Sequence, residues 1–507
     1  MHIYWPESFV FIGKSSPEGR NVSGDVVGCR ATAFAELLKS RNVTTGDRIA
    51  IWLTNGEDQI AAIMGCWAVG AAFCILPSFA GRTATERSQH RVNDVFSVLK
   101  PKLLVKGAGA DLPEALQGAA DTVELPRHDD LPRQTIDLES VLGDRSPNEM
   151  AFIQFTSGST GGAKGAVVCF GQLETNLDAI AQRSKLSVSD RMVSWAPLYH
   201  DMGLMAVLLP LSRNADLVLM ETDHFVRRPT AWLEAITRFR GTITTAPPTA
   251  LKLLTRRAAK SVDLTSLRYG WIGGEMVFPT VIEAFEETYA SSGLSKGVLQ
   301  PTYGMAETVV GISCGIPGEQ WSVKDGFISC GPVLPDMELR IVNNDDLEVE
   351  AGEQGQIHVR GPSVINGYLG LEPSATGAWF DTGDLGFVAD NRVYVTGRTK
   401  DLLKRGGETF PATVVEAIAE NALDLSTGRA AAFTCFQLAE GREEIVLLIE
   451  SRNWDDSQAR VVGAAVASEL GLQVDIVRNA QGGRLPRTSS GKIMRQRTAQ
   501  MYQEGLI

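Results

Sequence analysis

The chain has 507 residues, of which 44% are hydrophobic and 21% are charged. This composition allows about three domain-sized units with a large buried core, and it excludes a disordered or fibrous protein. Lysine and arginine total 48 against 60 aspartates and glutamates, a formal net charge of −12 that argues against nucleic acid or an anionic membrane as a partner, because both attract basic faces.

The cysteines and histidines carry no metal or disulfide pattern. The seven cysteines form no CxxC pair, and the six histidines show no paired spacing. Reduced, mostly buried thiols are therefore favoured over a disulfide framework, and a structural zinc site is disfavoured.

The N-terminal segment and the apolar runs indicate where in the cell the protein is expected. Residues 1–6 lack a basic stretch followed by an apolar one, so they do not form a signal-peptide pattern. The longest apolar stretch, 61–79, is interrupted by Gly65, Gly70 and Pro77, which makes it a poor candidate for a membrane span. We therefore expect a cytoplasmic protein without a membrane span.

Short β-type runs alternate with helical patterns through the first part of the chain. The patterns predict strands at 47–53, 72–76, 217–220 and 242–245, and helices at 58–69 and 232–239. Strand–helix–strand alternation is typical of parallel sheets covered by helices. The sequence therefore predicts an α/β fold.

The pattern changes at about residue 327, where short strands separated by turn residues follow one another at 338–342, 355–359 and 392–395. We expect an antiparallel β subdomain over about 327–396, inside a large domain of residues 1–399. A helix at 411–422 and renewed strand–helix alternation predict a small α+β domain at 400–507.

The segment 155–165 (FTSGSTGGAKG) has the composition of a phosphate-binding loop. Its glycines let successive backbone N–H groups converge, while its hydroxyls and a lysine add donors and positive charge. It is not a Walker A motif, because Gly165 follows Lys164 where Ser or Thr is required. A flexible turn is the alternative, but such turns rarely combine so many hydroxyls with a lysine. The candidate phosphate ligands are Thr156, Ser157, Gly158, Ser159, Thr160, Gly161 and Lys164.

This loop resembles that of the adenylate-forming superfamily, which contains acyl-CoA synthetases, fatty acyl-AMP ligases, peptide-synthetase adenylation domains and luciferases. Further segments resemble motifs of the superfamily in the same order, at 67–73, 197–204, 273–275, 303–307, 382–385, 397–401 and 485–493. The ordered set covers most of the chain and is closest to fatty acyl-AMP ligases and acyl-CoA synthetases. The resemblance implies an ATP- and Mg²⁺-dependent reaction that joins a carboxylate to the α-phosphorus and expels pyrophosphate. Such catalysis is mainly positioning and placement of cations.

The resemblance implies a nucleotide site in the large domain. Glu307 would hold Mg²⁺ on the phosphates, and Tyr303, followed by Gly304, would stack on adenine. Gly274 and Glu275 belong to another matching motif that would contribute to the nucleotide site. Taken alone, Glu307 would be read as a surface acid and Tyr303 as a core residue.

Five further roles follow from the same resemblance. Asp384 and Arg398 would contact the ribose, and His200 would lie beside the acyl carboxylate. Lys492 would contact the carboxylate and the bridging phosphate oxygen during adenylation, and Lys400 matches the hinge about which the small domain rotates. Taken alone, these residues would be an ordinary turn acid, solvated cations and a core histidine.

The motifs disagree about the thiol that would accept the acyl group. The segments 200–203 and 329–331 resemble fatty acyl-AMP ligases. The short connection from Glu307 to Cys330 lacks the insertion that those ligases carry nearby, and the segment 406–408 looks more like coenzyme A ligases. The acceptor therefore stays open between coenzyme A and an acyl carrier protein.

The acid is expected to be hydrophobic rather than an amino acid. Asp201 follows Tyr199 and His200, whereas amino-acid-activating domains place an aspartate in a Phe-Asp-x-Ser pattern. Two alternatives stay open: a ligase that stops at the acyl adenylate and passes it to a partner protein, and a non-catalytic nucleotide-binding relative.

Overall fold

A computed structural model describes residues 1–77, 86–126, 134–157, 163–375, 377–405, 408–437, 442–481, 483–488 and 492–507. The chain divides into two compact units. Unit 1 comprises Met1–Leu339, Val359–Phe380 and Asp390–Val393, and unit 2 comprises Arg340–His358, Asp381–Ala389 and Tyr394–Ile507. This division splits the predicted antiparallel subdomain between the two units. The predicted domain boundary at residue 400 stays a prediction.

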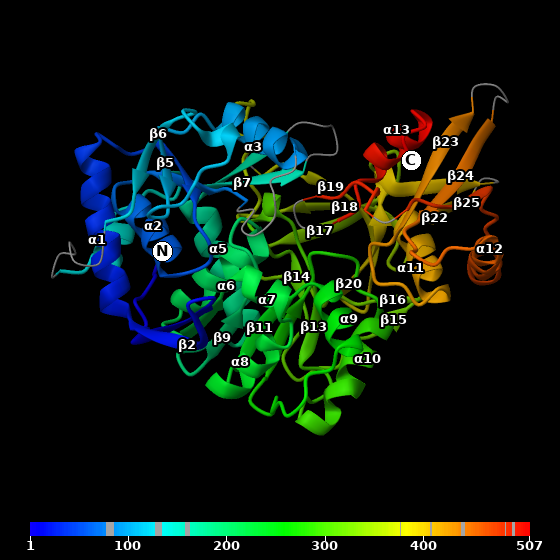
Figure 1. Cartoon of the computed structure of the whole chain (residues 1–507), viewed down its shortest axis with the longest axis horizontal. Coiled ribbons are helices and arrows are strands. Elements are labelled where there is room, and N and C mark those ends of the chain that lie inside the picture. The colour runs from blue at the N-terminus through cyan, green and yellow to red at the C-terminus, as the bar shows by residue number, and fades with distance from the viewer. Residues whose placement is uncertain are drawn as a thin grey trace. The chain divides into compact units, whose positions relative to one another are not determined.

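One sheet of unit 1 has six strands in the order β6-β5-β3-β4-β7-β8. The strands are parallel except β8, which runs antiparallel to β7. Their bounds are Arg48–Trp52 (β3), Ala72–Ile75 (β4), Leu103–Lys106 (β5), Asp121–Glu124 (β6), Met150–Ser157 (β7) and Ala163–Cys169 (β8). Helices α1 (Gly24–Ser40) and α2 (Glu57–Ala68) pack on each other beside this sheet (Figure 1). The predicted strands at 47–53 and 72–76 and the helix at 58–69 are confirmed.

The second sheet of unit 1 has eight strands in the order β14-β13-β12-β11-β9-β10-β1-β2. The six central strands are parallel and the two edge strands antiparallel. The bounds are Ser8–Gly13 (β1), Ser16–Ser23 (β2), Arg191–Ser194 (β9), Asp216–Met220 (β10), Ile243–Ala246 (β11), Tyr269–Ile272 (β12), Leu299–Tyr303 (β13) and Ser313–Cys314 (β14). The sequence predicted β10 and β11 but not the hairpin β1–β2.

Helices accompany the eight-stranded sheet. Their bounds are Phe170–Ser184 (α5), Asp201–Leu211 (α6), Ala231–Phe239 (α8), Pro248–Arg256 (α9) and Pro279–Tyr289 (α10). Side chains of α8, α9 and α10 join those of the strands in one hydrophobic core. None of the helices in the described part of the chain combines the length and apolar character that a membrane crossing needs.

A four-stranded sheet follows the order β17-β18-β19-β20 and contributes residues to both units. Its bounds are Glu338–Val342 (β17), Gly355–Arg360 (β18), Phe380–Ala389 (β19) and Arg392–Arg398 (β20). Asp390 and Asn391, which join β19 to β20, have φ of 50° and 56°. Two positive φ angles in a two-residue loop are typical of a type I′ hairpin, which makes this strand pair antiparallel.

The C-terminal part of unit 2 is an α+β arrangement. It contains β21 (Leu402–Arg405), β22 (Glu408–Pro411), α11 (Ala412–Ala422), β23 (Ala430–Gln437), β24 (Arg442–Ile449), α12 (Asp456–Leu470), β25 (Ile476–Asn479) and α13 (Arg495–Gln503). Alternate residues of β23 face opposite sides of its sheet, as the pleat requires. Ala430 and Ala432 join the core that includes α11 and α12, whereas Ala431 and Phe433 join the one that includes α13.

Trp67 ties α2 to strand β7. Its side chain is fully buried, its ring lies 5.7 Å from that of Phe73 and 5.5 Å from that of Phe170, and its Nε1–H donates to the carbonyl of Ala151 at 2.8 Å. Burial of this large ring and its satisfied donor therefore fixes the strand that leads to the predicted phosphate loop.

We expect Trp67→Phe to destabilise the fold by about 2–3 kcal/mol, because it opens a cavity and leaves the Ala151 carbonyl without its donor. The denaturant midpoint of unfolding measures this effect. Trp5→Phe is the matched control, since Trp5 is half-buried and donates to Ile136 over 3.2 Å. Equal midpoints for the wild type and Trp67→Phe would contradict this stabilising role of Trp67.

Candidate active site

The predicted site residues of unit 1 follow the carboxyl ends of strands. Thr156 and Ser157 end β7, Tyr303 ends β13, and Gly274 is the second residue after β12. In open parallel sheets, ligands bind outside these ends. The predicted site residues therefore lie at the carboxyl ends of strands in both sheets of unit 1.

The hairpin β7–β8 carries the ends of the predicted phosphate loop. Thr156 pairs with Lys164 across the hairpin, and the backbone of Ser157 pairs with that of Ala163. Gly158, Ser159, Thr160 and Gly161 lie outside the described residues. The Lys164 ammonium lies over the ring of Tyr368, 5.4 Å from its centroid.

Tyr368 connects this hairpin to Glu307. Its hydroxyl donates to Oε1 of Glu307 at 2.9 Å, and the backbone around it joins β8 through a bridge to Ala166 and a 2.7 Å hydrogen bond from Leu369 to Gly165. Burial, together with the Glu307 carboxylate, raises the pKa of Tyr368 well above its usual range, so the hydroxyl stays a donor. Sequence reasoning missed Tyr368, which lies outside every segment that carried the resemblance.

Glu307 lies in a short 3-10 helix, η4 (Ala306–Thr308), and is 7% exposed. The turns on both sides are tightly constrained. A Cβ on Gly304 would lie 1.7 Å from the carbonyl oxygen of Val310, so only glycine fits there. Val309 has φ of 68°, a strained conformation for a β-branched residue. Asn176 of α5 exchanges two hydrogen bonds with the backbone of Gly311 at 3.0 and 3.1 Å.

The loop that leads to His200 is held from two sides. Gln154 of β7 donates to the Tyr199 carbonyl at 2.6 Å. The buried Asn55 donates to the carbonyls of Trp195, Ala196 and Met220 at 3.5, 2.9 and 3.2 Å, and it accepts from the Leu198 N–H at 3.3 Å. His200 caps α6, and its ring lies 4.6 Å from that of Tyr199. Asn55 and Gln154 therefore fix the segment that presents His200.

An apolar cavity of about 80 Å³ lies between α5, α6 and the ends of β12–β14. Its lining includes three predicted site residues, Gly274, Tyr303 and Gly304, as well as Asp201. The apolar lining residues are Ile180, Met192, Met202, Met205, Ala206, Leu209, Trp271, Val310, Cys314 and Leu334. Burial raises the pKa of the Cys314 thiol to about 11. The neighbouring Glu275 accepts a 3.4 Å hydrogen bond from the Thr249 N–H.

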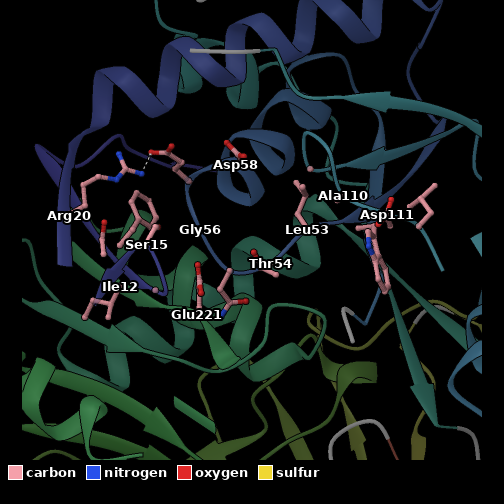
Figure 2. A pocket seen from close by; sticks show the side chains of 18 of the residues that line it. Ile12, Ser15, Arg20, Leu53, Thr54, Gly56, Asp58, Ala110, Asp111 and Glu221 are labelled. Carbon is pink, nitrogen blue, oxygen red and sulfur yellow. Dashed lines mark ion pairs between the residues drawn. The ribbon is translucent and has the colours of Figure 1, made fainter. Parts of the chain in front are cut away.

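A larger cavity of about 560 Å³ lies beside β1 and β3 (Figure 2). Arg20 and Glu57 form an ion pair of 2.9 Å in its wall, and Asp58, Asp111 and Glu221 add carboxylates. None of the described residues predicted for the site lines this cavity. Asn55 does line it, and thus lies between this cavity and the loop that leads to His200.

Unit 2 holds the remaining predicted residues. Asp384 is 5% exposed, and its Oδ1 accepts a 3.0 Å hydrogen bond from Nε of Arg398, so the two predicted ribose contacts lie together. Lys400 lies in a short 3-10 helix, η5 (Thr399–Asp401). Lys492 pairs through its backbone with Thr488, at 2.7 Å and 3.1 Å.

Glu307 fits a ligand of Mg²⁺. Mg²⁺ usually takes one or two carboxylates together with phosphate oxygens and water, rather than a cage of protein ligands. The described residues contain no group of three or more histidine, cysteine or acidic side chains that could hold a metal by themselves. A single buried carboxylate, linked through Tyr368 to the predicted phosphate loop, suits the first arrangement.

Comparisons with known proteins identify relatives of this chain. The model of the family described as "AMP-binding enzyme" matches residues 5–369. A protein of Caulobacter vibrioides named "Putative acyl-CoA synthetase" is 30% identical over 94% of this chain and 89% of its own. A 4-hydroxyphenylalkanoate adenylyltransferase of Mycobacterium marinum is 28% identical over 93% of this chain and 84% of its own. A solved fatty acyl-adenylate ligase, from a study of the E. coli and L. pneumophila enzymes, has a TM-score of 0.86 and 27% identity, with 99% of this chain and 96% of that one covered.

We expect Asn55→Asp to make activity depend on pH. The ionised carboxylate of this variant cannot donate to the carbonyls that Asn55 now satisfies, whereas the protonated carboxyl can donate to one of them. Burial favours the protonated form, so the activity of the variant relative to wild type should rise as the pH falls from about 8 to about 6.

Pyrophosphate-exchange rates across that pH range measure the effect. Asn55→Ala is the control, since it loses the same hydrogen bonds without a titrating group and should be impaired equally at every pH. Parallel profiles for Asn55→Asp and Asn55→Ala would exclude this role for the Asn55 amide.

Proposed function

The chain belongs to the AMP-binding enzyme family, and from this premise we propose that it activates a hydrophobic carboxylic acid as an acyl adenylate and releases pyrophosphate. We further propose that it then transfers the acyl group to the thiol of a pantetheine arm on coenzyme A or on a carrier protein. The observation that carries the proposal is the connection from Lys164 through Tyr368 to Glu307, at the strand ends that also border an apolar cavity.

In the proposed reaction, a carboxylate oxygen of the acid bonds to the α-phosphorus of ATP as the bond to the bridging oxygen breaks. Lys164, at the base of the phosphate loop, supplies positive charge to the polyphosphate. Tyr368 orients the Glu307 carboxylate, because its hydroxyl occupies Oε1. Mg²⁺ bound by Glu307 and the phosphates would offset negative charge on pyrophosphate. Lys492 completes the phosphate contacts in the proposed mechanism.

The lining of the 80 Å³ cavity supports a hydrophobic acyl group. Its methionines are unbranched and adapt to ligands of different shape. The cavity begins beside Tyr303 and Gly304, so an acid bound there would have its carboxylate near the proposed nucleotide site. Asp201, at the start of α6, also lines it and lies directly after His200.

The proposal also concerns the thiol that accepts the acyl group. The connection between Glu307 and Cys330 contains only β14 and a small hairpin of β15 (Val323–Lys324) and β16 (Phe327–Ile328). This short connection supports access for coenzyme A. Adenylation without thioester formation, with the acyl group passed to a partner protein, is the alternative.

One experiment tests the proposed activity and its acceptor. Pyrophosphate exchange over fatty, aromatic and polycyclic acids should identify an accepted hydrophobic acid. With that acid and ATP, either coenzyme A or a pantetheinylated carrier should then become acylated. Absence of exchange with every acid would refute the activity, and acylation of the carrier alone would exclude coenzyme A as the acceptor.

We expect Glu307→Gln to lower the adenylation rate by at least about 100-fold, because the amide keeps the shape of the side chain but removes the charge that a metal ligand needs. The melting temperature should stay within a few degrees of wild type. Tyr368→Phe, which leaves the carboxylate but removes its hydrogen bond, should have a smaller effect of about 10-fold. Near-normal turnover of Glu307→Gln would remove Glu307 from the proposed site.

The two half-reactions should separate in variants of unit 2. Lys492→Ala should lose pyrophosphate release but still form thioester from pre-made acyl adenylate, because the pyrophosphate has then already left. Lys400→Pro should do the reverse, because proline fixes φ at the proposed hinge. Equal loss of both half-reactions in a folded Lys492→Ala variant would contradict the alternating mechanism.

A further inference from the structure

The segment that carries Lys492 forms a small fold in which residues 486–488 pair with residues 492–494. The Thr488 N–H donates to the Lys492 carbonyl at 2.7 Å, the Lys492 N–H donates to Oγ1 of Thr488 at 3.1 Å, and the Met494 N–H donates to the Pro486 carbonyl at 2.9 Å. Arg487 and Ile493 form an antiparallel bridge in the same segment. The backbone of Lys492 is therefore held in a fixed register just before α13.

An arginine anchors each side of this fold to a buried glutamate. On one side, Nη2 of Arg487 donates to Oε2 of Glu450 at 2.6 Å, and the Glu450 side chain is 1% exposed. On the other side, Arg495 binds both oxygens of Glu416, with Nε at 2.7 Å and Nη2 at 2.5 Å. Two parallel bonds of this kind fix direction as well as distance.

Arg495 makes one further contact that reaches the proposed hinge. Its Nη1 donates to Oδ2 of Asp401 at 2.7 Å, and Asp401 directly follows Lys400. Glu416 belongs to α11 and also accepts from the Ala432 N–H at 2.9 Å. One guanidinium thus joins the first residue of α13, helix α11 and the segment that contains Lys400.

The charges of this cluster depend on one another. Burial raises the pKa of Glu416 despite the opposing effect of Arg495. Burial of Arg495 acts against its own charge, but Glu416 and Asp401 outweigh this and raise its pKa. Removing one partner from such a cluster leaves a buried charge uncompensated. A lysine at 495 would keep the charge but could not reproduce the planar fork that binds three carboxylate oxygens.

We propose that Arg495 is a positioning residue that holds Lys492 in a fixed place relative to the hinge segment at Lys400, so that the two move as one rigid piece. This inference rests on the proposed function, in which Lys492 serves adenylation and Lys400 is the hinge. Rotation about the hinge then moves Lys492 together with the hinge segment.

Hydrogen–deuterium exchange of the full-length protein without ligands tests whether Arg495 couples the segment of Lys492 to that of Lys400. Arg495→Lys should speed amide exchange at least about fivefold in both 399–403 and 486–494. Arg487→Lys is the matched control, since it loosens the other side of the fold and should speed exchange in 486–494 alone. Unchanged exchange at 399–403 in Arg495→Lys would overturn the proposal, and this readout needs no enzymatic activity.

A double-mutant cycle, measured by pyrophosphate exchange, tests whether Arg495 affects adenylation through Lys492. Arg495→Lys should lower the exchange kcat at least about tenfold while the KM values for acid and ATP change less than about twofold. In the Lys492→Ala background the same substitution should change the residual rate by less than about twofold, because Arg495 acts through Lys492. Additive losses would show that Arg495 has only a structural role. If the wild type showed no pyrophosphate exchange, the proposed function would be refuted instead. The hydrogen–deuterium exchange comparison would still decide whether segments 399–403 and 486–494 are coupled.

Discussion

A buried carboxylate must have its charge satisfied, and at the proposed site of unit 1 that carboxylate is Glu307. The hydroxyl of Tyr368 supplies one hydrogen bond, and Tyr368 is in turn held because its backbone joins strand β8. The same tyrosine ring receives the Lys164 ammonium. The Tyr368 side chain therefore contacts both the acidic group, Glu307, and the basic group, Lys164, of the proposed site. The neighbouring elements hold Tyr368 and Glu307 in place.

Much of this holding is done by buried side-chain amides. Asn55 and Gln154 fix the loop before His200, and Asn176 fixes the turn after Glu307. Gln172 donates to the Val364 carbonyl at 3.0 Å and so supports the segment that leads to Tyr368. An amide both donates and accepts without carrying charge, so it can satisfy two buried backbone groups where no regular strand or helix does so. These four amides thus bond the described loops beside the site to the strands and helices around them.

The sequence was sufficient for the features that depend on local patterns. Sequence patterns located β3, β4, β10 and β11 and the helices α2 and α8, and the glycine-rich and Tyr-Gly motifs located the ends of β7 and β13. The edge strand β2 was missed because its sequence, SPEGRNVS, has mostly exposed polar residues and no apolar alternation. Tyr368, Asn55 and Asn176 were missed for a different reason, since each acts across a long sequence separation and none belongs to a motif that single-sequence reasoning could use.

Cys314 is one of the residues that line the cavity in which we place the acid, and it is buried. An acyl adenylate is a strong acylating agent, and a thiolate beside it would capture the acyl group before any external acceptor could. Burial raises the pKa of this thiol to about 11, however, so the thiol stays protonated near neutral pH. The apolar surroundings that suit a hydrophobic acid thus also disfavour the thiolate, so under the proposed function an acyl adenylate bound there would lie beside a protonated cysteine.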